Sequence, residues 1–233
     1  SISGARHWLG SLGLIDKRAT EKFIPDPVFG LDQSGLATFL GRLWSGDGFV
    51  FLDGNRVPYY ATSSPRLAQD LQHLLLKLGI VSRVTKKEFN YRGGFKTGYT
   101  VHLLTRESIQ AFADVIGPEL IGKAKALAAL REYLKGLTED RMSSDTVPIE
   151  ARELVRAEKS RAAVRWEDVE TGTGLSVEEL RRTGGAKKGF RRWTLKALAD
   201  YFASDRLREL AESDIFWDTV VSIEPDGEEE TFD

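Results

Sequence analysis

One acidic residue, Asp47, ends an apolar segment and is followed directly by Gly48, and this junction constrains the fold more than any other feature. Residues 36–45 carry apolar side chains at helical spacing, and Asp47-Gly48 leads into a strand-like run at 49–53. The pattern therefore predicts a carboxylate where a helix ends and a sheet begins. Carboxylate oxygens suit hard divalent cations, so this junction is a candidate metal site.

The elements after this junction predict an α+β domain. Two strands are expected at 49–53 and 57–63, followed by a helix that starts at Pro65 and ends before Gly79. A second strand pair at 80–89 and 97–104 flanks a Gly-rich hairpin turn, and two helices follow at 107–116 and 119–135. The predicted order of elements is αββαββαα.

Alternation in the second strand pair predicts a sheet with two different faces. The polar and basic residues of one face are Arg83, Thr85, Lys87, Lys96, Thr100 and His102. Apolar residues occupy the other face, which we expect to pack under helices. Any half-exposed sheet gives such a pattern, but a basic sheet face also fits a DNA major groove. Alternation alone leaves both interpretations open.

Composition excludes several kinds of site. The 233 residues include no cysteine, which rules out disulfides, thiolate metal sites and cysteine nucleophiles. The three histidines have no ligand spacing, so we expect no zinc site. No apolar run approaches the roughly 20 residues of a membrane span, and no signal peptide is visible. We therefore expect a cytoplasmic protein without a membrane partner.

Charge is distributed unevenly, although the net charge is only −2. Residues 137–165 predict a linker helix, and 166–212 predict a small helical module in which a capping box at 176–179 opens a helix. A Gly-rich basic turn then precedes helices at 193–202 and 206–211. The module resembles a helix-turn-helix, and a solvated basic loop is the alternative. Its candidate DNA-binding residues are Arg181, Arg182, Lys187, Lys188, Arg191 and Arg192.

The run Leu40-Gly-Arg-Leu-Trp-Ser-Gly-Asp47-Gly48 resembles the LAGLIDADG motif of homing endonucleases. The runs Trp8-Leu, Glu21-Lys-Phe-Ile-Pro25 and Val28-Phe29 resemble the stretch between the two motifs of such an enzyme within an intein. Residues 213–233 resemble the strand that begins the C-terminal splicing segment. The likeness is to inteins of bacterial replicative DNA helicases and of the alpha subunit of DNA polymerase III. It implies a connector at 1–35 and an endonuclease half-domain at 36–136 with a saddle-shaped antiparallel sheet.

The resemblance also implies roles for individual residues. Asp47 and Gly48 would hold Mg²⁺, with Mn²⁺ as a substitute; Lys123 would lie near the scissile phosphate, and Ser63 would orient a water. A solvated helix lysine is the alternative for Lys123, and an N-cap of the helix after Pro65 is the alternative for Ser63. Base contacts would come from the polar sheet face together with Phe51, Arg56, Tyr60 and Arg92. Contacts to a second motif helix would come from Leu40, Gly41, Leu43 and Trp44.

The implied function is site-specific hydrolysis of phosphodiester bonds in a long double-stranded DNA target. Cutting both strands needs two acids, and the chain carries one such motif. The second half would come from an N-terminal segment, another chain, or a second copy in a homodimer. The termini needed for splicing would lie outside this chain, next to a host protein. The alternatives are a non-catalytic LAGLIDADG and helix-turn-helix DNA-binding regulator, or an inactive remnant of the nuclease.

Overall fold

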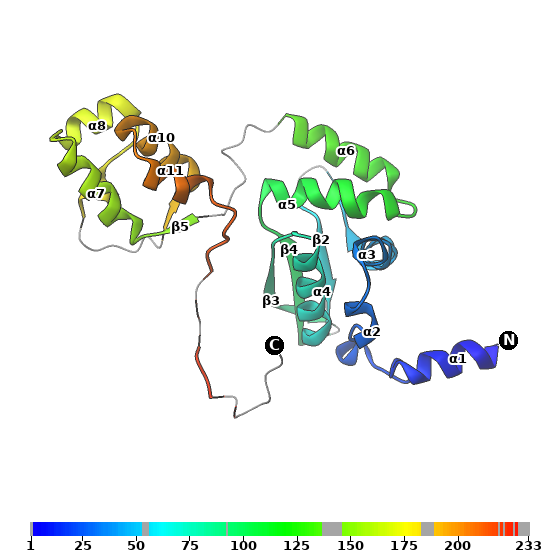
Figure 1. The fold of residues 1–233 in the computed structure, drawn as a ribbon. Coiled ribbons are helices and arrows are strands. Elements are labelled where there is room, and N and C mark those ends of the chain that lie inside the picture. Colours follow the sequence, from blue (N-terminus) through cyan, green and yellow to red (C-terminus); the bar gives the residue numbers. More distant parts are fainter. Residues whose placement is uncertain are drawn as a thin grey trace. The chain divides into compact units, whose positions relative to one another are not determined.

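The chain divides into two units, Ser1–Ser144 and Asp145–Asp233 (Figure 1). Each unit contains its own hydrophobic core. This computed structural model describes residues 2–52, 56–91, 93–136, 146–182, 189–218, 220, 222–225 and 227. Among these residues, no helix combines the length and apolar character that crossing a membrane requires.

The first unit has the predicted order of elements from residue 33 onward. Three short helices come first: α1 (Ile2–Ser11), the 3₁₀ turn η1 (Ala19–Glu21) and α2 (Asp26–Phe29). The central elements are α3 (Gln33–Asp47), β1 (Gly48–Phe49), β2 (Tyr59–Thr62), α4 (Pro65–Lys77), β3 (Ser82–Tyr91) and β4 (Gly94–Leu103). The unit ends with α5 (Arg106–Ala111), the π turn η2 (Phe112–Ile116), the 3₁₀ turn η3 (Gly117–Glu119) and α6 (Ala124–Lys135). The expected α+β architecture is confirmed.

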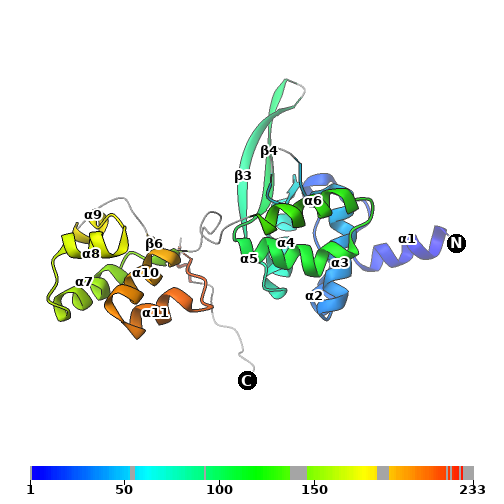
Figure 2. The same ribbon diagram turned by 90° about the horizontal axis from the view of Figure 1, so that it is seen from above.

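The four strands form one antiparallel sheet in the order β1-β2-β4-β3. Arg83 lies opposite His102 and Thr85 lies opposite Thr100, so their side chains share a face as predicted. Val84 and Val101 form a pair on the other face. The hairpin of β3 and β4 projects beyond the helices (Figure 2). Arg83, Lys87 and Lys96 on the polar face of this ribbon are exposed, so this face is open.

Helices α3 and α4 contribute large apolar side chains beneath the other face of the sheet. Trp44 and Leu40 of α3 are fully buried, as are Leu71 and Leu74 of α4. Strand β1 is shorter than the predicted run at 49–53. After β1, Val50 is buried in the core, and the Phe51 ring packs against Tyr133 of α6.

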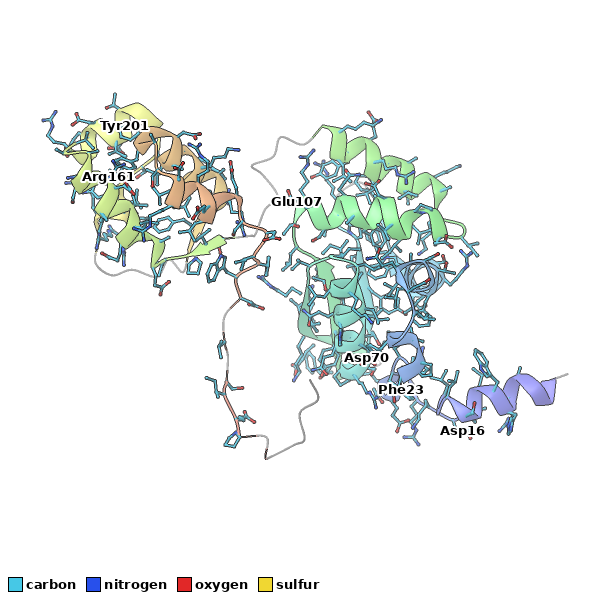
Figure 3. All side chains as sticks on the ribbon, in the orientation of Figure 1. Asp16, Phe23, Asp70, Glu107, Arg161 and Tyr201 are labelled. Atoms are coloured by element: carbon cyan, nitrogen blue, oxygen red, sulfur yellow. The ribbon has the colours of Figure 1, made fainter. Side chains whose placement is uncertain are left out.

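The segment before α3, which we expected to be a connector, belongs partly to the first core. Ile24 is 1% exposed, and its N–H donates to Asp70 Oδ2 of α4 at 2.8 Å. The guanidinium of Arg66 lies 4.6 Å from the centre of the Phe23 ring. Figure 3 shows Phe23 and Asp70 close together. Backbone and side-chain contacts thus fix residues 22–24 against the start of α4.

Ser64, rather than Ser63, caps helix α4. Its hydroxyl accepts a hydrogen bond from the Leu67 N–H and donates one to the Lys22 carbonyl at 2.5 Å. The proposed N-cap role of Ser63 is therefore wrong, and Ser63 is left half-buried at the end of β2.

The second unit is a helical module with one short strand pair. Its elements are β5 (Thr146–Pro148), α7 (Ala151–Arg161), α8 (Trp166–Thr173), α9 (Glu178–Arg181), β6 (Gly189–Arg191), α10 (Arg192–Phe202) and α11 (Asp205–Glu212). Val155 of α7 is fully buried with Phe190, Leu195 and Leu198. Residues 151–161, expected within a linker helix, are therefore part of this core.

A buried carboxylate connects α7 to the start of α11. Glu158 is 8% exposed and accepts hydrogen bonds from Arg161 Nε at 2.7 Å and Ser204 Oγ at 2.9 Å. These bonds hold the pKa of Glu158 below its ordinary value. Ser204 also caps α11 by accepting from the Leu207 N–H.

The connection between α9 and α10 differs from the predicted helix-turn-helix. Helix α9 has four residues and is preceded by Val177 at the N-cap, so the expected capping box at Ser176 does not form. Strand β6 then pairs with β5 before α10 begins. A helix-turn-helix needs a turn of about three or four residues. A tight connection instead joins α10 to α11, where Ala203 adopts a left-handed conformation with φ of 49°.

The described residues after α11 form neither helix nor strand, so the strand expected near 213–224 is absent there. Val220 is 72% exposed and Ile223 is 90% exposed. Backbone groups need partners to form a strand, and no strand of the described residues pairs with this segment.

Gly41 is a packing constraint, whereas Gly46 on the same helix is not. A Cβ at Gly41 would lie 2.4 Å from Glu119 Cβ, while a Cβ at Gly46 would meet nothing within 4 Å. We expect Gly41→Ala to lower the free energy of unfolding of the first unit by about 1–3 kcal/mol. Gly46→Ala, the matched control, should raise it by up to about 1 kcal/mol. Urea unfolding measures both, and equal stabilities would contradict this packing.

Candidate functional site

Asp47 is the last residue of α3, and its side chain is exposed. The helix ends here because Gly48 turns to an extended conformation and pairs with Tyr60 of β2. Only glycine fits at position 48, since a Cβ there would lie 2.2 Å from Trp44 Cδ1. The indole Nε1 of Trp44 donates to the Phe49 carbonyl at 2.9 Å, which fixes the first residues of the sheet. The backbone therefore presents the carboxylate at the predicted junction.

Lys123 lies beside this junction although it is 75 residues from Gly48 in the sequence. It occupies the N-cap position of α6, is half-buried, and donates from Nζ to the Gly48 carbonyl. The structure thus brings together Asp47, Gly48 and Lys123.

Two cavities meet at Asp47. The larger, of about 410 Å³, is lined by residues that include Asp47, Ser63, Lys87 and Glu88. The smaller, of about 270 Å³, also has Asp47 in its wall. Ser63 therefore lines the same cavity as the carboxylate.

Lys22 lines both cavities, and reasoning from the residues missed it. Its side chain is exposed, and its carbonyl is fixed by the buried hydroxyl of Ser64. The signal was the run Glu21-Lys-Phe-Ile-Pro25, which we assigned to a connector. The contact between this segment and α4 turns an apparent connector into part of the site.

The prediction that Tyr60 contacts bases is wrong, because its side chain is 2% exposed on the helix-covered face. Burial raises the pKa of Tyr60 to about 12, and the negative charge of Asp47 and a hydrogen bond to it add to the shift. Its neighbour Tyr59 lies on the open face instead. The Tyr59 ring stacks on Phe49 with centroids 4.8 Å apart and lies 5.5 Å from His102.

The open sheet face carries the basic residues that the alternation predicted. Arg83, Lys87 and Lys96 are exposed, and Thr85, Thr100 and His102 are half-buried. Burial and the nearby positive charge of Lys87 lower the pKa of His102. A neutral imidazole can both donate and accept hydrogen bonds, which suits contacts to base edges.

Phe51 and Arg56 lie away from this face. The Phe51 ring packs 5.7 Å from the Tyr133 ring of α6, and the Arg56 guanidinium lies 5.1 Å from the same ring. Their expected base contacts are not supported by this placement. Arg92 lies outside the described residues.

Three of the four residues expected at a second motif helix face the core of their own unit. Leu40 and Trp44 are fully buried, and Gly41 packs on Glu119. These three predictions are wrong because the side of α3 that they occupy is already covered. Leu43 is half-buried and lies on the more open side. That side also carries Phe39, Arg42 and Gly46.

Arg42 occupies part of this open side and is paired within its own unit. Its guanidinium forms an ion pair with the Glu119 carboxylate at 3.4 Å and also donates to the Glu119 carbonyl. The pair keeps the Arg42 head group near η3.

The expected DNA-binding role of Arg192 is wrong. Its guanidinium donates to the Leu210 and Ala211 carbonyls at 3.1 and 3.3 Å and to the Ile215 carbonyl. These bonds satisfy the C-terminal end of α11 and leave the side chain half-buried.

The other basic residues of the second unit are more accessible. Arg191, Arg181 and Arg182 are exposed, and the last two form exposed ion pairs with acids of α8 and α9. Arg156 of α7 donates to the carbonyls of Leu180, Arg181 and Arg182 and so fixes the backbone there. Lys187 and Lys188 lie outside the described residues.

The donor set at Asp47 fits a hard divalent cation with few protein ligands. Among the described residues, no group of three or more carboxylate, imidazole or thiol side chains could hold a metal ion. One carboxylate and the adjacent Gly48 carbonyl remain, and the carbonyl also accepts from Lys123. Mg²⁺ usually binds through one or two carboxylates together with waters and substrate phosphates. Waters and substrate phosphates would therefore complete the coordination of a cation held there.

Comparisons with known proteins agree with this geometry. Residues 34–117 match the model of the LAGLIDADG-like domain. Over 97% of its length, the chain is 35% identical to part of the "Replicative DNA helicase DnaB" of Rhodothermus marinus and covers 24% of that protein. It is 33% identical to part of the protein of the same name from a Synechocystis species, and covers 26% of it. The protein of that name from a Nostoc species is 34% identical over 97% of the chain, which again covers 26% of it.

The chain spans about a quarter of the length of the helicase relatives. LAGLIDADG domains bind DNA, are generally endonucleases, and typically use divalent metals. Residues 34–117 of this chain therefore contain a LAGLIDADG-like domain.

Proposed function

We propose that this chain is the endonuclease part of an intein and hydrolyses phosphodiester bonds at a specific site in double-stranded DNA. The observation that carries the proposal is the exposed Asp47 carboxylate, with Lys123 bonded to the adjacent Gly48 carbonyl. A metal-dependent nuclease needs a cation site and a nearby positive side chain that can contact the phosphate. Asp47 and Lys123 would supply these at the end of α3.

Each residue has a separate task in this proposal. Asp47, with the Gly48 carbonyl, would hold Mg²⁺ or Mn²⁺. The bound cation supplies positive charge that stabilises the charge developing on phosphate oxygens. Lys123 and Lys22 add fixed positive charge beside those oxygens. The Ser63 hydroxyl, in the wall of the same cavity, can hydrogen-bond the attacking water.

The open sheet face would bind the duplex. An antiparallel ribbon fits a major groove, and arginine, threonine and a neutral histidine can read base edges there. Tyr59 joins this surface in place of Tyr60. The exposed Arg181, Arg182 and Arg191 of the second unit would contact phosphates flanking the site and lengthen it.

Cutting both strands requires a second LAGLIDADG half. We infer that it would pack on the more open side of α3, which carries Phe39, Leu43 and Gly46. An N-terminal segment, another chain or a second copy could supply it. The similarity to stretches of replicative helicases supports such a helicase as the host protein that flanks the intein.

The proposed DNA-binding surface can be tested by the salt dependence of DNA affinity in variants of two neighbouring lysines. Lys87 lies on the open face, whereas Lys86 is also exposed but points to the opposite face. A duplex is first selected from a random library in Ca²⁺, and its affinity is measured over a range of salt concentrations. We expect Lys87→Gln to reduce the slope of log K against log salt by about 1. Lys86→Gln should leave the slope unchanged.

If the two variants have equal slopes, the DNA does not bind to this face of the sheet. Failure to select any duplex at low salt would remove the nuclease proposal itself.

A further inference from the structure

Tyr60 is a buried tyrosine whose polar end reaches the candidate metal site. Its side chain is 2% exposed, yet it lines both cavities that contain Asp47. Asp47 lines the same two cavities, so the Tyr60 hydroxyl and the Asp47 carboxylate are neighbours in their walls. A buried tyrosine hydroxyl generally has a hydrogen-bond partner, and the Asp47 carboxylate is an acceptor in the walls of the same cavities.

Packing fixes the position of the Tyr60 ring. The ring lies 5.4 Å from the Trp44 ring, which in turn lies 5.1 Å from Phe112, and all three are buried. Tyr60 of β2 pairs with Gly48 of β1, the residue that directly follows Asp47. The pairing therefore holds Tyr60 next to Asp47. The ring therefore has little freedom, and its hydroxyl is a preorganised donor.

Asp47 has less support of its own. It is exposed and is the last residue of α3, where no further helical turn surrounds it. A carboxylate in this position can rotate among several orientations. A donor that selects one of them would lower the cost of binding a cation in that geometry.

We propose that Tyr60 is a positioning residue that orients the Asp47 carboxylate for the divalent cation by donating its hydroxyl proton. The inference rests on the proposed function. Tyr59 and Tyr60 are neighbours on β2 whose side chains lie on opposite faces of the sheet, and they would have different roles. Tyr59 faces DNA, and Tyr60 faces the acid.

The test uses the full chain with the selected duplex and Mn²⁺ as the probe. Tyr60→Phe keeps the ring and removes the hydroxyl. We expect cleavage at limiting Mn²⁺ to fall about 10–100-fold, because partners of metal ligands typically have effects of that size. Electron paramagnetic resonance of the DNA-bound chain should show weaker Mn²⁺ binding. Duplex affinity in Ca²⁺ and the thermal unfolding midpoint should stay close to those of the unmodified chain.

Tyr99→Phe is the matched control, because Tyr99 is a half-buried tyrosine in the wall of the larger cavity, and it should leave the Mn²⁺ dependence unchanged. If Tyr60→Phe has the Mn²⁺ affinity and cleavage rate of the unmodified chain, the positioning role is overturned and the proposed function stands. If the unmodified chain neither binds Mn²⁺ nor cleaves the duplex, both are overturned.

Discussion

Asp47→Asn should reduce Mg²⁺-dependent cleavage of the selected duplex by at least about a thousandfold and leave its affinity in Ca²⁺ nearly unchanged. The substitution keeps the size of the side chain and removes the charge that would hold the cation. Metal ions contribute several kcal/mol to charge stabilisation in such reactions, which corresponds to a rate factor of about 10³ or more. Binding should survive because the open sheet face carries most of the expected DNA contacts.

Glu88→Gln is the control for this prediction because Glu88 lines the larger cavity together with Asp47. It should retain most of the cleavage activity. A variant of Asp47 that cuts as fast as the unmodified chain would remove this residue from the mechanism. If only the Glu88 variant loses most of its cleavage activity, Glu88 of β3 rather than Asp47 binds the metal.

Trp44→Ala should destabilise the first unit by about 3–5 kcal/mol, the range for removing a large aromatic side chain from a core. Trp44 is fully buried, contacts Tyr60 and Phe112, and donates to the Phe49 carbonyl. The loss should therefore also loosen the backbone that presents Asp47. Urea unfolding should show a lower midpoint for the first unit only, since the second unit has its own core.

Trp193→Ala provides the comparison, because Trp193 is 38% exposed on α10. We expect it to change stability by less than about 1 kcal/mol. If Trp44→Ala leaves the first unit within that limit, the described core does not depend on the motif helix.

The order αββαββαα could be predicted from sequence because α4 and the β3–β4 hairpin have strong periodicity and clear boundaries, although β1 is shorter than predicted and α6 begins later, at Ala124. The alternation of Arg83, Thr85 and Lys87 also gave the correct face, since a ten-residue strand leaves little ambiguity. Strand β2 has only four residues and contains the pair Tyr59-Tyr60. A shift of one residue exchanges the faces of a strand. Both aromatic residues fit either face, so the sequence could not decide between them.

The faces of α3 could not be assigned for a related reason. Periodicity identifies apolar positions but does not say which neighbour covers them. Leu40 and Trp44 pack in their own unit, and the burial of Gly41 depends on Glu119, which is distant in sequence. Lys22 was missed because its position depends on a contact between the segment before α3 and Ser64.

The second unit was the least predictable part. Its basic stretch suggested a turn between two helices, but β6 pairs with β5, about 40 residues earlier in the chain. The charge of Arg192 suggested phosphate binding, whereas its guanidinium satisfies carbonyls at the end of α11. Charge alone does not distinguish a phosphate contact from a helix cap.

The most direct test of a metal-dependent nuclease is strand cleavage of the selected duplex by the unmodified chain, mapped at nucleotide resolution in Ca²⁺, Mg²⁺ and Mn²⁺. We predict breaks within the bound site in Mg²⁺ or Mn²⁺ and none in Ca²⁺, on one strand for a single half and on both when a second half is present. Tight, salt-dependent binding without a break in any of these ions, even at high protein concentration, would contradict a nuclease and support a DNA-binding regulator.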